Sequence, residues 1–469
     1  MTVAGRSNKM TPGYLTDGSL DLASNPIIGK KGQSALMRVE SSAAQARAQE
    51  PTDPAELANF DPTADGLRAD PYGVLGFARR NSPVFHLPDH DMWCVTRYED
   101  VAAILRDPGT YSNAPMGAVP EVPEGYREQL PNGYPGVIQF GALDPPAHTR
   151  IRRLAQQAMV PRILSHYEPA IRDIAAGMID EFGDGEFDFV ASFGERYAIR
   201  VMTSMLGVPL DDERRFQKWA RDSVLVVFGP PPSAAPPSDE AESELRNQLT
   251  ESMIEFDSYL RAQIAARRAD PREDILTPLA AAIGDPAEGG FSEQEVMGIL
   301  SQLLTGGTNT TSDLLAHSLV MLLEKPDRWR KLRQTPEDIA LVLEETLRRC
   351  SPARAVYRRT TKPVTLGAAE IPAGALLWVG LGSANRDDTV FASPEHFDPH
   401  RENLRDHFGF GRWTHFCLGA PLGRLIGRIA LEQMTDRLPT LRLVEAPREK
   451  DYSARILQPK LMRLRLSVT

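Results

Sequence analysis

The stretch that decides the fold is Phe410–Gly419, which reads Phe-Gly-Arg-Trp-Thr-His-Phe-Cys-Leu-Gly. It places Cys417 in a turn rich in glycine and aromatic residues, directly before the apolar, helix-forming segment Leu422–Arg437. A thiolate just before a helix is favoured by the helix dipole and by the free backbone N–H groups there. Taken alone, a free cysteine is more often a small buried hydrophobe. The rest of the chain decides between these two interpretations.

The composition is that of a globular protein with a large core. The 469 residues are 42% hydrophobic and carry a net charge of -10, which argues against general nucleic-acid binding because that needs a basic face. The three cysteines, Cys94, Cys350 and Cys417, are too few and odd in number for a disulfide framework, and they indicate a reducing compartment. No apolar run reaches the roughly 18 residues of a membrane span. We therefore expect a cytoplasmic protein.

The chain is predicted to have a short extension and one large domain. The first 50 residues lack the apolar core of a signal peptide and are rich in small and polar residues, a composition typical of flexible segments. We therefore expect residues 1–59 to form a flexible extension and residues 60–469 to form a single domain.

Residue patterns predict a mainly α-helical domain with small β-sheets. Helices are expected over 211–228, 240–268, 291–324 and 336–349, and strands within 82–97, 364–382 and 441–469. Residues 167–207 are expected to form two helical stretches joined by a turn at 183–185. The proline-rich run 229–238 cannot be helical and is expected to act as the hinge of a lid.

The longest predicted helix breaks a local rule at its centre. It carries Gly306 and Gly307 followed by several threonines, although each glycine costs a helix about 1 kcal/mol. Such a violation is typical of a functional site, where a flat ligand or dioxygen lies against the backbone and Thr310 supplies a hydroxyl. A helix–helix crossing through small residues explains the same pattern equally well.

Two pairs of charged residues have a spacing that brings them together. His148 and Arg152 are four residues apart and share one helix face, where they can bind an anion, although a solvated basic face is the simpler explanation. Glu345 and Arg348 are three apart on a mostly apolar helix. An exposed pair of this kind contributes little, whereas a buried one would lock the structure.

Together these motifs resemble those of the cytochrome P450 family of haem-thiolate monooxygenases, soluble bacterial type, from about residue 60 to the end of the chain. The resemblance implies that Cys417 is the axial ligand of haem b. It also implies that His148, Arg152, Arg358 and His415 bind the haem propionates, which suits buried charges that need partners. The haem would lie between the long central helix and the helix of the cysteine loop.

Three matching segments carry the resemblance further, and two of them depart from the family pattern. Trp413 stands where the family's cysteine loop usually has a glycine that allows a tight turn. Gly306, Gly307 and Thr310 match the oxygen-activation segment, with Thr310 implied as a proton relay. The acid that usually precedes this threonine is Asn309, and an amide cannot carry a proton as a carboxylate does. The third segment, Glu-x-x-Arg, is matched without a departure by Glu345 and Arg348, with Arg401 implied as the third member of a buried network.

The implied activity is insertion of one atom of dioxygen into a small or mid-sized apolar organic substrate, by hydroxylation or oxidative dealkylation. Electrons are expected from NAD(P)H through a separate ferredoxin or flavodoxin-type partner, which basic residues such as Arg412, Arg424 and Arg428 would meet unless they bind propionate or solvent. Asn309 leaves open a peroxide-driven or otherwise non-standard haem-thiolate enzyme. A non-enzymatic haem or gas sensor is a third hypothesis, which the lack of an output domain disfavours.

Overall fold

The computed structural model describes residues 51–61, 67, 70–117, 121–135, 140–227, 240–448, 451–452, 457 and 460–468. The chain divides into a small unit, residues 1–45 and 236–247, and a large unit, residues 46–235 and 248–469. The predictions of a flexible extension and of a proline hinge at 229–238 lie almost entirely outside the described residues. Within the predicted extension, the short helix η2 (Pro54–Asn59) is described, and its Leu57 is fully buried.

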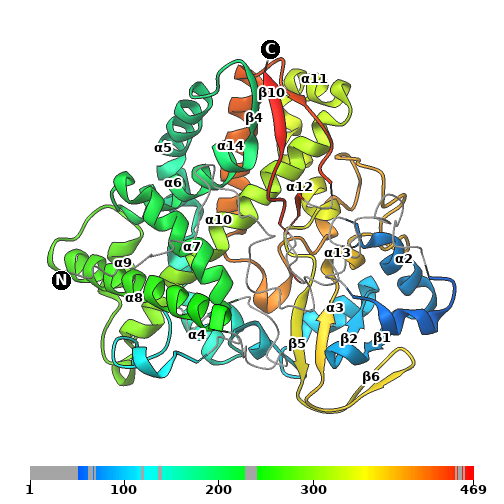
Figure 1. Cartoon of the computed structure of the whole chain (residues 1–469), viewed down its shortest axis with the longest axis horizontal. Coiled ribbons are helices and arrows are strands. Elements are labelled where there is room, and N and C mark those ends of the chain that lie inside the picture. Colours follow the sequence, from blue (N-terminus) through cyan, green and yellow to red (C-terminus); the bar gives the residue numbers. More distant parts are fainter. Residues whose placement is uncertain are drawn as a thin grey trace, which may run out of the picture. The chain divides into compact units, whose positions relative to one another are not determined.

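Helices make up most of the large unit, as predicted (Figure 1). The long helix α10 packs mainly against α6, α12 and α14, and α14 also packs against α5. The helices are α2 (Tyr72–Asn81), α3 (Tyr98–Arg106), α4 (Ala147–Gln157), α5 (Pro161–Asp180), α6 (Glu195–Leu206), α7 (Glu213–Val227), α8 (Glu240–Ala269), α9 (Leu276–Ala281), α10 (Glu293–Leu323), α11 (Pro326–Gln334), α12 (Ile339–Arg349), α13 (Leu381–Ala384) and α14 (Ala420–Arg437).

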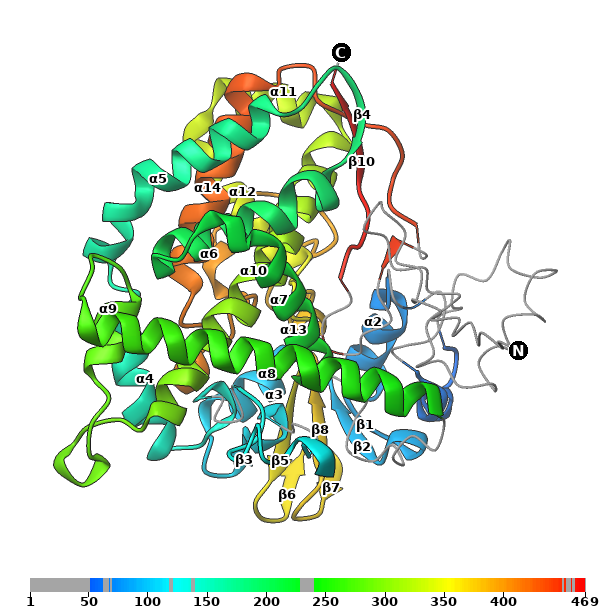
Figure 2. The same ribbon diagram turned by 60° about the vertical axis from the view of Figure 1, so that its left-hand side comes forward.

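The strands form small sheets at the margins of the helical core (Figure 2). One sheet has the order β1-β2-β8-β5-β3, in which only β2 and β8 are parallel. A second has the order β4-β10-β9, and β6 pairs with β7. The strands are β1 (Val84–Leu87), β2 (Met92–Val95), β3 (Tyr111–Ser112), β4 (Gly185–Asp188), β5 (Val356–Thr360), β6 (Val364–Leu366), β7 (Ala369–Ile371), β8 (Leu376–Val379), β9 (Arg442–Leu443) and β10 (Arg465–Val468).

One strand was not expected. Residues 183–185 were predicted to be a turn between two helices, but β4 begins at Gly185 and pairs with β10 near the C-terminus. Its partner is almost 300 residues away in sequence (Glu186 pairs with Ser467), and its four residues carry no alternation strong enough to predict a strand from the local pattern.

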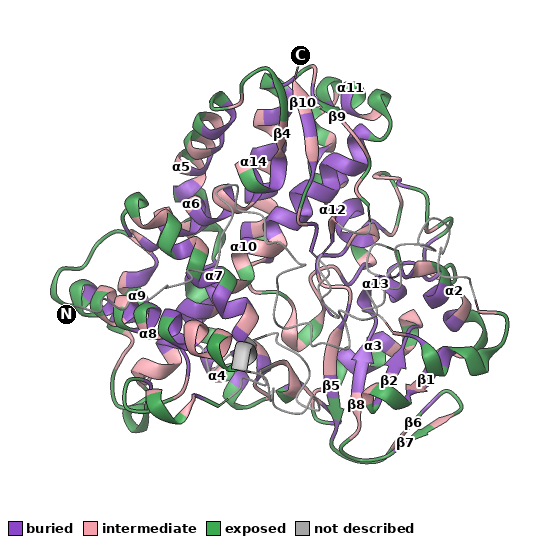
Figure 3. Ribbon diagram, in the orientation of Figure 1, coloured by how far each residue is buried: buried purple, intermediate pink, exposed green. Residues whose placement is uncertain are grey.

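Helix α10 forms because its start is capped and most of its length is apolar. Ser292 and Glu295 form the predicted capping box, and most side chains along the helix are buried (Figure 3). In its glycine-containing centre, the hydroxyls of Thr308 and Thr310 donate to the carbonyl oxygens of Leu304 and Gly306, at 2.7 and 2.6 Å. The helix therefore remains continuous through the two glycines.

Helix α12 carries the buried pair expected from the sequence. Arg348 donates two hydrogen bonds to the carboxylate of Glu345, at 2.7 and 2.8 Å, and both side chains are fully buried. Arg401 lies 3.4 Å from the same carboxylate. Arg348 also donates to the carbonyl oxygens of Asn385 and Pro394, so the pair ties α12 to the loops that precede the cysteine loop.

A second carboxylate on α12 makes stability depend on pH. Glu344 is buried, which alone would raise its pKa, but hydrogen bonds from Arg424 and His407 outweigh this and lower the pKa to about 2 from an ordinary value of 4.5. Because the folded-state pKa lies below the unfolded one, the stabilisation is present above pH 4.5 and is lost as the pH falls toward 2.

We therefore expect Glu344→Gln to lower the free energy of unfolding by about 3 kcal/mol at neutral pH, from roughly 1.4 kcal/mol per pKa unit. The difference from the wild type should shrink as the pH falls below about 4.5. Urea denaturation between neutral and acidic pH measures this difference. The control is Glu337→Gln at an exposed position, and a pH-independent difference for Glu344→Gln would contradict the prediction.

Candidate functional site

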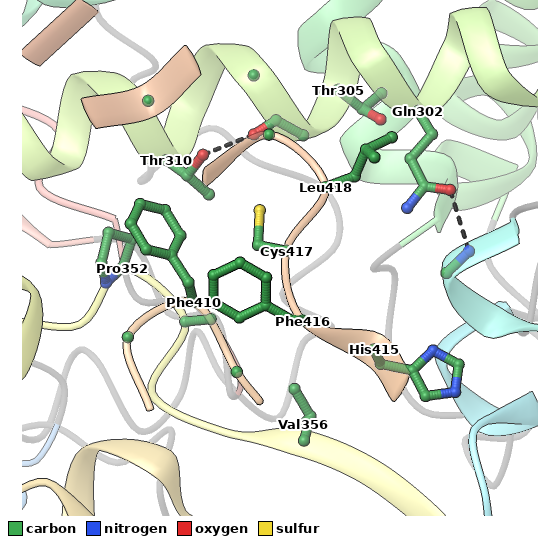
Figure 4. Close-up of a pocket in the computed structure, with 18 of the residues that line it drawn as sticks. Gln302, Thr305, Thr310, Pro352, Val356, Phe410, His415, Phe416, Cys417 and Leu418 are labelled. Carbon is green, nitrogen blue, oxygen red and sulfur yellow. Dashed lines mark hydrogen bonds between the residues drawn. The ribbon is translucent and has the colours of Figure 1, made fainter. Parts of the chain in front are cut away.

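A cavity of about 340 Å³ separates the centre of α10 from the loop 410–419. Thr310 on α10 and Cys417 on the loop lie on opposite sides of it (Figure 4), and Gly306 and Gly307 of α10 also line it. The Cys417 side chain is exposed toward this cavity, whereas Cys94 is buried in the core. The remaining walls are largely apolar and include Met116, Phe140, Met159, Met202, Leu303 and Val356.

The loop holds Cys417 by backbone hydrogen bonds. Its N–H donates to the carbonyl oxygen of Phe410 at 2.8 Å, and helix α14 begins three residues later. Although the sulfur faces the cavity, the surrounding protein removes it from bulk water, and this desolvation raises the pKa of the Cys417 thiol. The N–H groups of Gly419 and Ala420, which donate to the sulfur, together with Arg152, offset this only in part. A bound metal cation would overcome that penalty, because coordination deprotonates a thiol.

Trp413, which departs from the family pattern, does not crowd the cavity. Its φ is 56°, so it adopts the left-handed backbone conformation that glycine tolerates best, and Gly411 has a φ of 64°. The indole ring turns to the surface, where it is 37% exposed. There the guanidinium of Arg106 lies 4.7 Å from the ring centroid. The loop thus keeps its turn without the usual glycine, at the cost of backbone strain.

We expect Trp413→Gly to leave the free energy of unfolding within about 1 kcal/mol of the wild type. Relief of roughly 1–2 kcal/mol of left-handed strain is offset by loss of a cation–π contact of about 0.5–1 kcal/mol and of the ring's packing. Trp413→Ala is the matched control, since it loses the ring but keeps the Cβ. Chemical denaturation should show the alanine variant to be less stable than the glycine variant. Equal stabilities would mean that the turn is not strained.

Basic groups gather at one edge of the cavity. Arg152 and Arg358 line the cavity, and the buried His148 packs against His415 with 4.2 Å between ring centroids and the rings tilted by 46°. Both ring nitrogens of His148 and Nε2 of His415 have no hydrogen-bond partner among the described residues. Neither arginine pairs with a described carboxylate. Arg152 donates a hydrogen bond to the backbone oxygen of Phe416, and Arg358 donates to that of Tyr357. Buried donors without acceptors are costly, so this edge suits an anionic ligand.

Burial determines the protonation state of these histidines and arginines. It lowers the pKa of His148 to about 4 and that of His415 to about 3, with neighbouring arginines adding to the effect. It also lowers the pKa of Arg358 to about 10. The histidines are therefore neutral N–H donors at neutral pH, and the arginines supply the positive charge.

The residues present fit haem b. A thiol faces the cavity from one side, and a Cβ added to Gly306 on the other side would meet no atom within 4 Å, so the helix leaves room for a flat ring. Four basic side chains at the edge match two propionates. The sequence-predicted residues Cys417, Thr310, Gly306 and Gly307 thus line one cavity, with the predicted anion-binding residues beside them.

Two residues near this cavity were not predicted. Lys460 donates from Nζ to Oδ1 of Asn309 at 2.9 Å and forms an ion pair with Glu195. Lys460 is 151 residues from Asn309 in sequence, and no local pattern marks either residue of the ion pair. Only the fold brings them together.

The basic residues suggested for a redox partner are largely neutralised. Arg424 pairs with Glu344, Arg412 with Asp406, and Arg428 with Glu168 and Glu432. These ion pairs are partly exposed. Each of the three arginines thus has an acidic partner in this chain, and the expectation that they meet a ferredoxin stays a prediction.

Comparisons with known proteins identify the family of the chain. The cytochrome P450 family model matches residues 81–337 and 339–456. Cytochrome P450 107B1 of Saccharopolyspora erythraea is 34% identical over 382 residues, 80% of this chain and 88% of that protein. Erythromycin C-12 hydroxylase of the same organism is 32% identical over 368 residues, 78% of this chain and 87% of that protein.

Solved structures give the same result. Cytochrome P450 CYP109Q5 from Chondromyces apiculatus is similar with a TM-score of 0.75 and 32% identity, over 87% of this chain and 98% of that chain. The bacillaene polyketide synthase cytochrome P450 PksS of Bacillus subtilis is similar with a TM-score of 0.74 and 30% identity, over 87% and 100%. In the part of the chain that the structure describes, no helix has the length and apolar character of a transmembrane span.

Proposed function

The chain belongs to the cytochrome P450 family of monooxygenases, and on that premise we propose that it oxygenates a mid-sized, largely apolar organic molecule bound between α10 and the cysteine loop. The observation that carries this proposal is the position of the Cys417 thiol across the cavity from Gly306 and Thr310. Both ring nitrogens of His148 and Nε2 of His415, which have no hydrogen-bond partner among the described residues, add to it.

Haem b, when bound, supplies the dioxygen activation and the electron storage that the protein's own side chains lack. Cys417 would ligate the iron, and its thiolate would favour O–O cleavage. His148, Arg152, Arg358 and His415 would hold the propionates by charge-assisted hydrogen bonds.

The residues at the centre of α10 would bind the haem ring and orient small ligands without carrying charge themselves. Gly306 and Gly307 would let the ring approach the helix. The Thr310 hydroxyl, which donates to the Gly306 carbonyl oxygen, can rotate to hold a proton over the cavity. Asn309 would orient water by its amide, since it cannot itself titrate.

The composition of the cavity wall and the names of the relatives indicate the class of substrate. Apolar side chains make up most of the cavity wall, and Gln302 is one of the polar residues among them, a balance typical of sites for organic ligands. Relatives are named as a hydroxylase of erythromycin, an epoxidase of cyclomarin C and an N-oxygenase of nocardicin C. We infer a natural-product-like substrate for this chain as well. Reduction by NAD(P)H through a ferredoxin or flavodoxin-type partner, and a cytoplasmic location, stay predictions.

Isotopically labelled dioxygen tests the reaction. A ligand screen that follows the low- to high-spin shift of the haem spectrum identifies a substrate, and turnover with ferredoxin, reductase and NAD(P)H should place one labelled oxygen atom in the product. Asn309 keeps a peroxide-driven enzyme as the second candidate. Product formed with hydrogen peroxide but not with the electron-transfer system would favour that candidate instead.

A further inference from the structure

The amide of Asn309 is held in one orientation from outside its helix. Asn309 lines the cavity next to Thr310, and its Oδ1 accepts a hydrogen bond from Lys460 Nζ at 2.9 Å. A lysine ammonium only donates hydrogen bonds, so the amide oxygen must face Lys460. The two N–H donors of the amide therefore face away from Lys460.

The backbone beside Lys460 is anchored to the same helix. The N–H of Leu461 donates to the buried carboxylate of Asp313 at 2.9 Å, and Asp313 is one helical turn after Asn309, on the same face. The Lys460 side chain is only 10% exposed. Lys460 is therefore fixed in the interior and does not sample the surface as most lysines do.

Glu195 balances the charge of Lys460. It is the first residue of α6 and directly follows the π-helical turn Val190–Gly194. A Cβ added to Gly194 would lie 2.5 Å from Oγ of Ser312 on α10, so the close approach of this turn to α10 depends on glycine. The Glu195 side chain is 36% exposed, so the series Glu195, Lys460, Asn309 runs from solvent to the cavity.

We propose that Lys460 is a positioning residue that orients the Asn309 amide so that its N–H donors serve the cavity beside Thr310, with Glu195 as the counter-ion that holds Lys460. This rests on the proposed function, since it concerns ligands of the haem. The cavity then presents a fixed hydrogen-bond donor, backed by a positive charge, to water or to a small molecule on the haem.

Carbon monoxide on the reduced holoenzyme is the probe. A donor or positive charge near its oxygen lowers the C–O stretching frequency, which infrared spectroscopy measures without turnover. We expect Lys460→Met to shift the band to higher wavenumber and to broaden it, because the amide is free to turn. Lys460→Arg should keep the wild-type band, Glu195→Gln should give a smaller shift in the same direction, and Lys331→Met, at an exposed position on α11, should give none.

The Asn309→Ala background distinguishes an effect of Lys460 through the Asn309 amide from a direct effect of the lysine charge on the bound carbon monoxide. If Lys460 acts through the amide, Lys460→Met should shift the band much less in Asn309→Ala than in the wild type. An equal shift in both backgrounds, or no shift in either, would overturn the inference. Should Lys460→Met fail to bind haem, Glu195→Gln and Lys460→Gln give the same comparison in the same two backgrounds. Absence of the red-shifted Soret band in the wild type would instead refute the proposed haem-thiolate function.

Discussion

Replacing Cys417 with serine is expected to abolish the strongly red-shifted Soret band that a thiolate-ligated haem gives when reduced and bound to carbon monoxide. The band depends on a sulfur ligand, and in the structure Cys417 is the cysteine that lines the cavity. Serine keeps the size of the side chain but is not deprotonated at neutral pH, so it cannot push electron density onto iron as a thiolate does. The monooxygenase activity should be lost together with the band.

The matched control is Cys350→Ser, which changes another free cysteine away from the cavity and should keep the band. Because the Cys417 side chain faces the cavity and does not pack in the core, the free energy of unfolding of the haem-free Cys417→Ser protein should lie within about 0.5 kcal/mol of the wild-type value. Loss of the band is then not a folding defect. A band that persists in Cys417→Ser, or is missing in the wild type, would refute the assignment of Cys417.

The sequence predicted those parts of the molecule in which local pattern and local structure coincide. Helix α10 has its capping box, its long apolar face and its glycines all within one segment, so its approximate bounds and the residues with which it lines the cavity were both predictable. The cysteine loop was predictable because ten adjacent residues carry the pattern. The mainly helical fold with small sheets follows from the same kind of signal and is confirmed.

What could not be predicted depends on contacts between distant segments. Strand β4 exists because β10 pairs with it. Likewise, Lys460 reaches Asn309 only because the C-terminal segment returns to α10. Trp413 is a different case, because the sequence shows a bulky residue at a glycine position but not where the ring points. Only the fold shows that the guanidinium of Arg106 on α3 packs over the ring at the surface.

Replacing Arg348 with alanine is expected to cost about 3–5 kcal/mol of folding free energy, the range for removing one partner of a buried ion pair. The carboxylate of Glu345 would remain buried, with Arg401 at 3.4 Å as its nearest cation. Urea denaturation measures the loss. The control is Arg330→Ala, which breaks an exposed pair with Asp327 and should cost less than about 1 kcal/mol. A similar small cost for both variants would show that the buried pair does not stabilise the fold.

A double substitution separates the ion pair from the rest of the network. Where charge balance alone matters, replacing both partners of a buried pair with apolar residues is often neutral. Here Arg348 also donates to the carbonyl oxygens of Asn385 and Pro394, and Glu345 accepts the N–H of Asp398. Glu345→Leu with Arg348→Leu would leave these backbone groups without partners, at roughly 1–3 kcal/mol for each buried group. The double variant should therefore stay well below the wild type in stability. The pair not only balances its own charges but also forms hydrogen bonds with backbone groups of the loops before the cysteine loop.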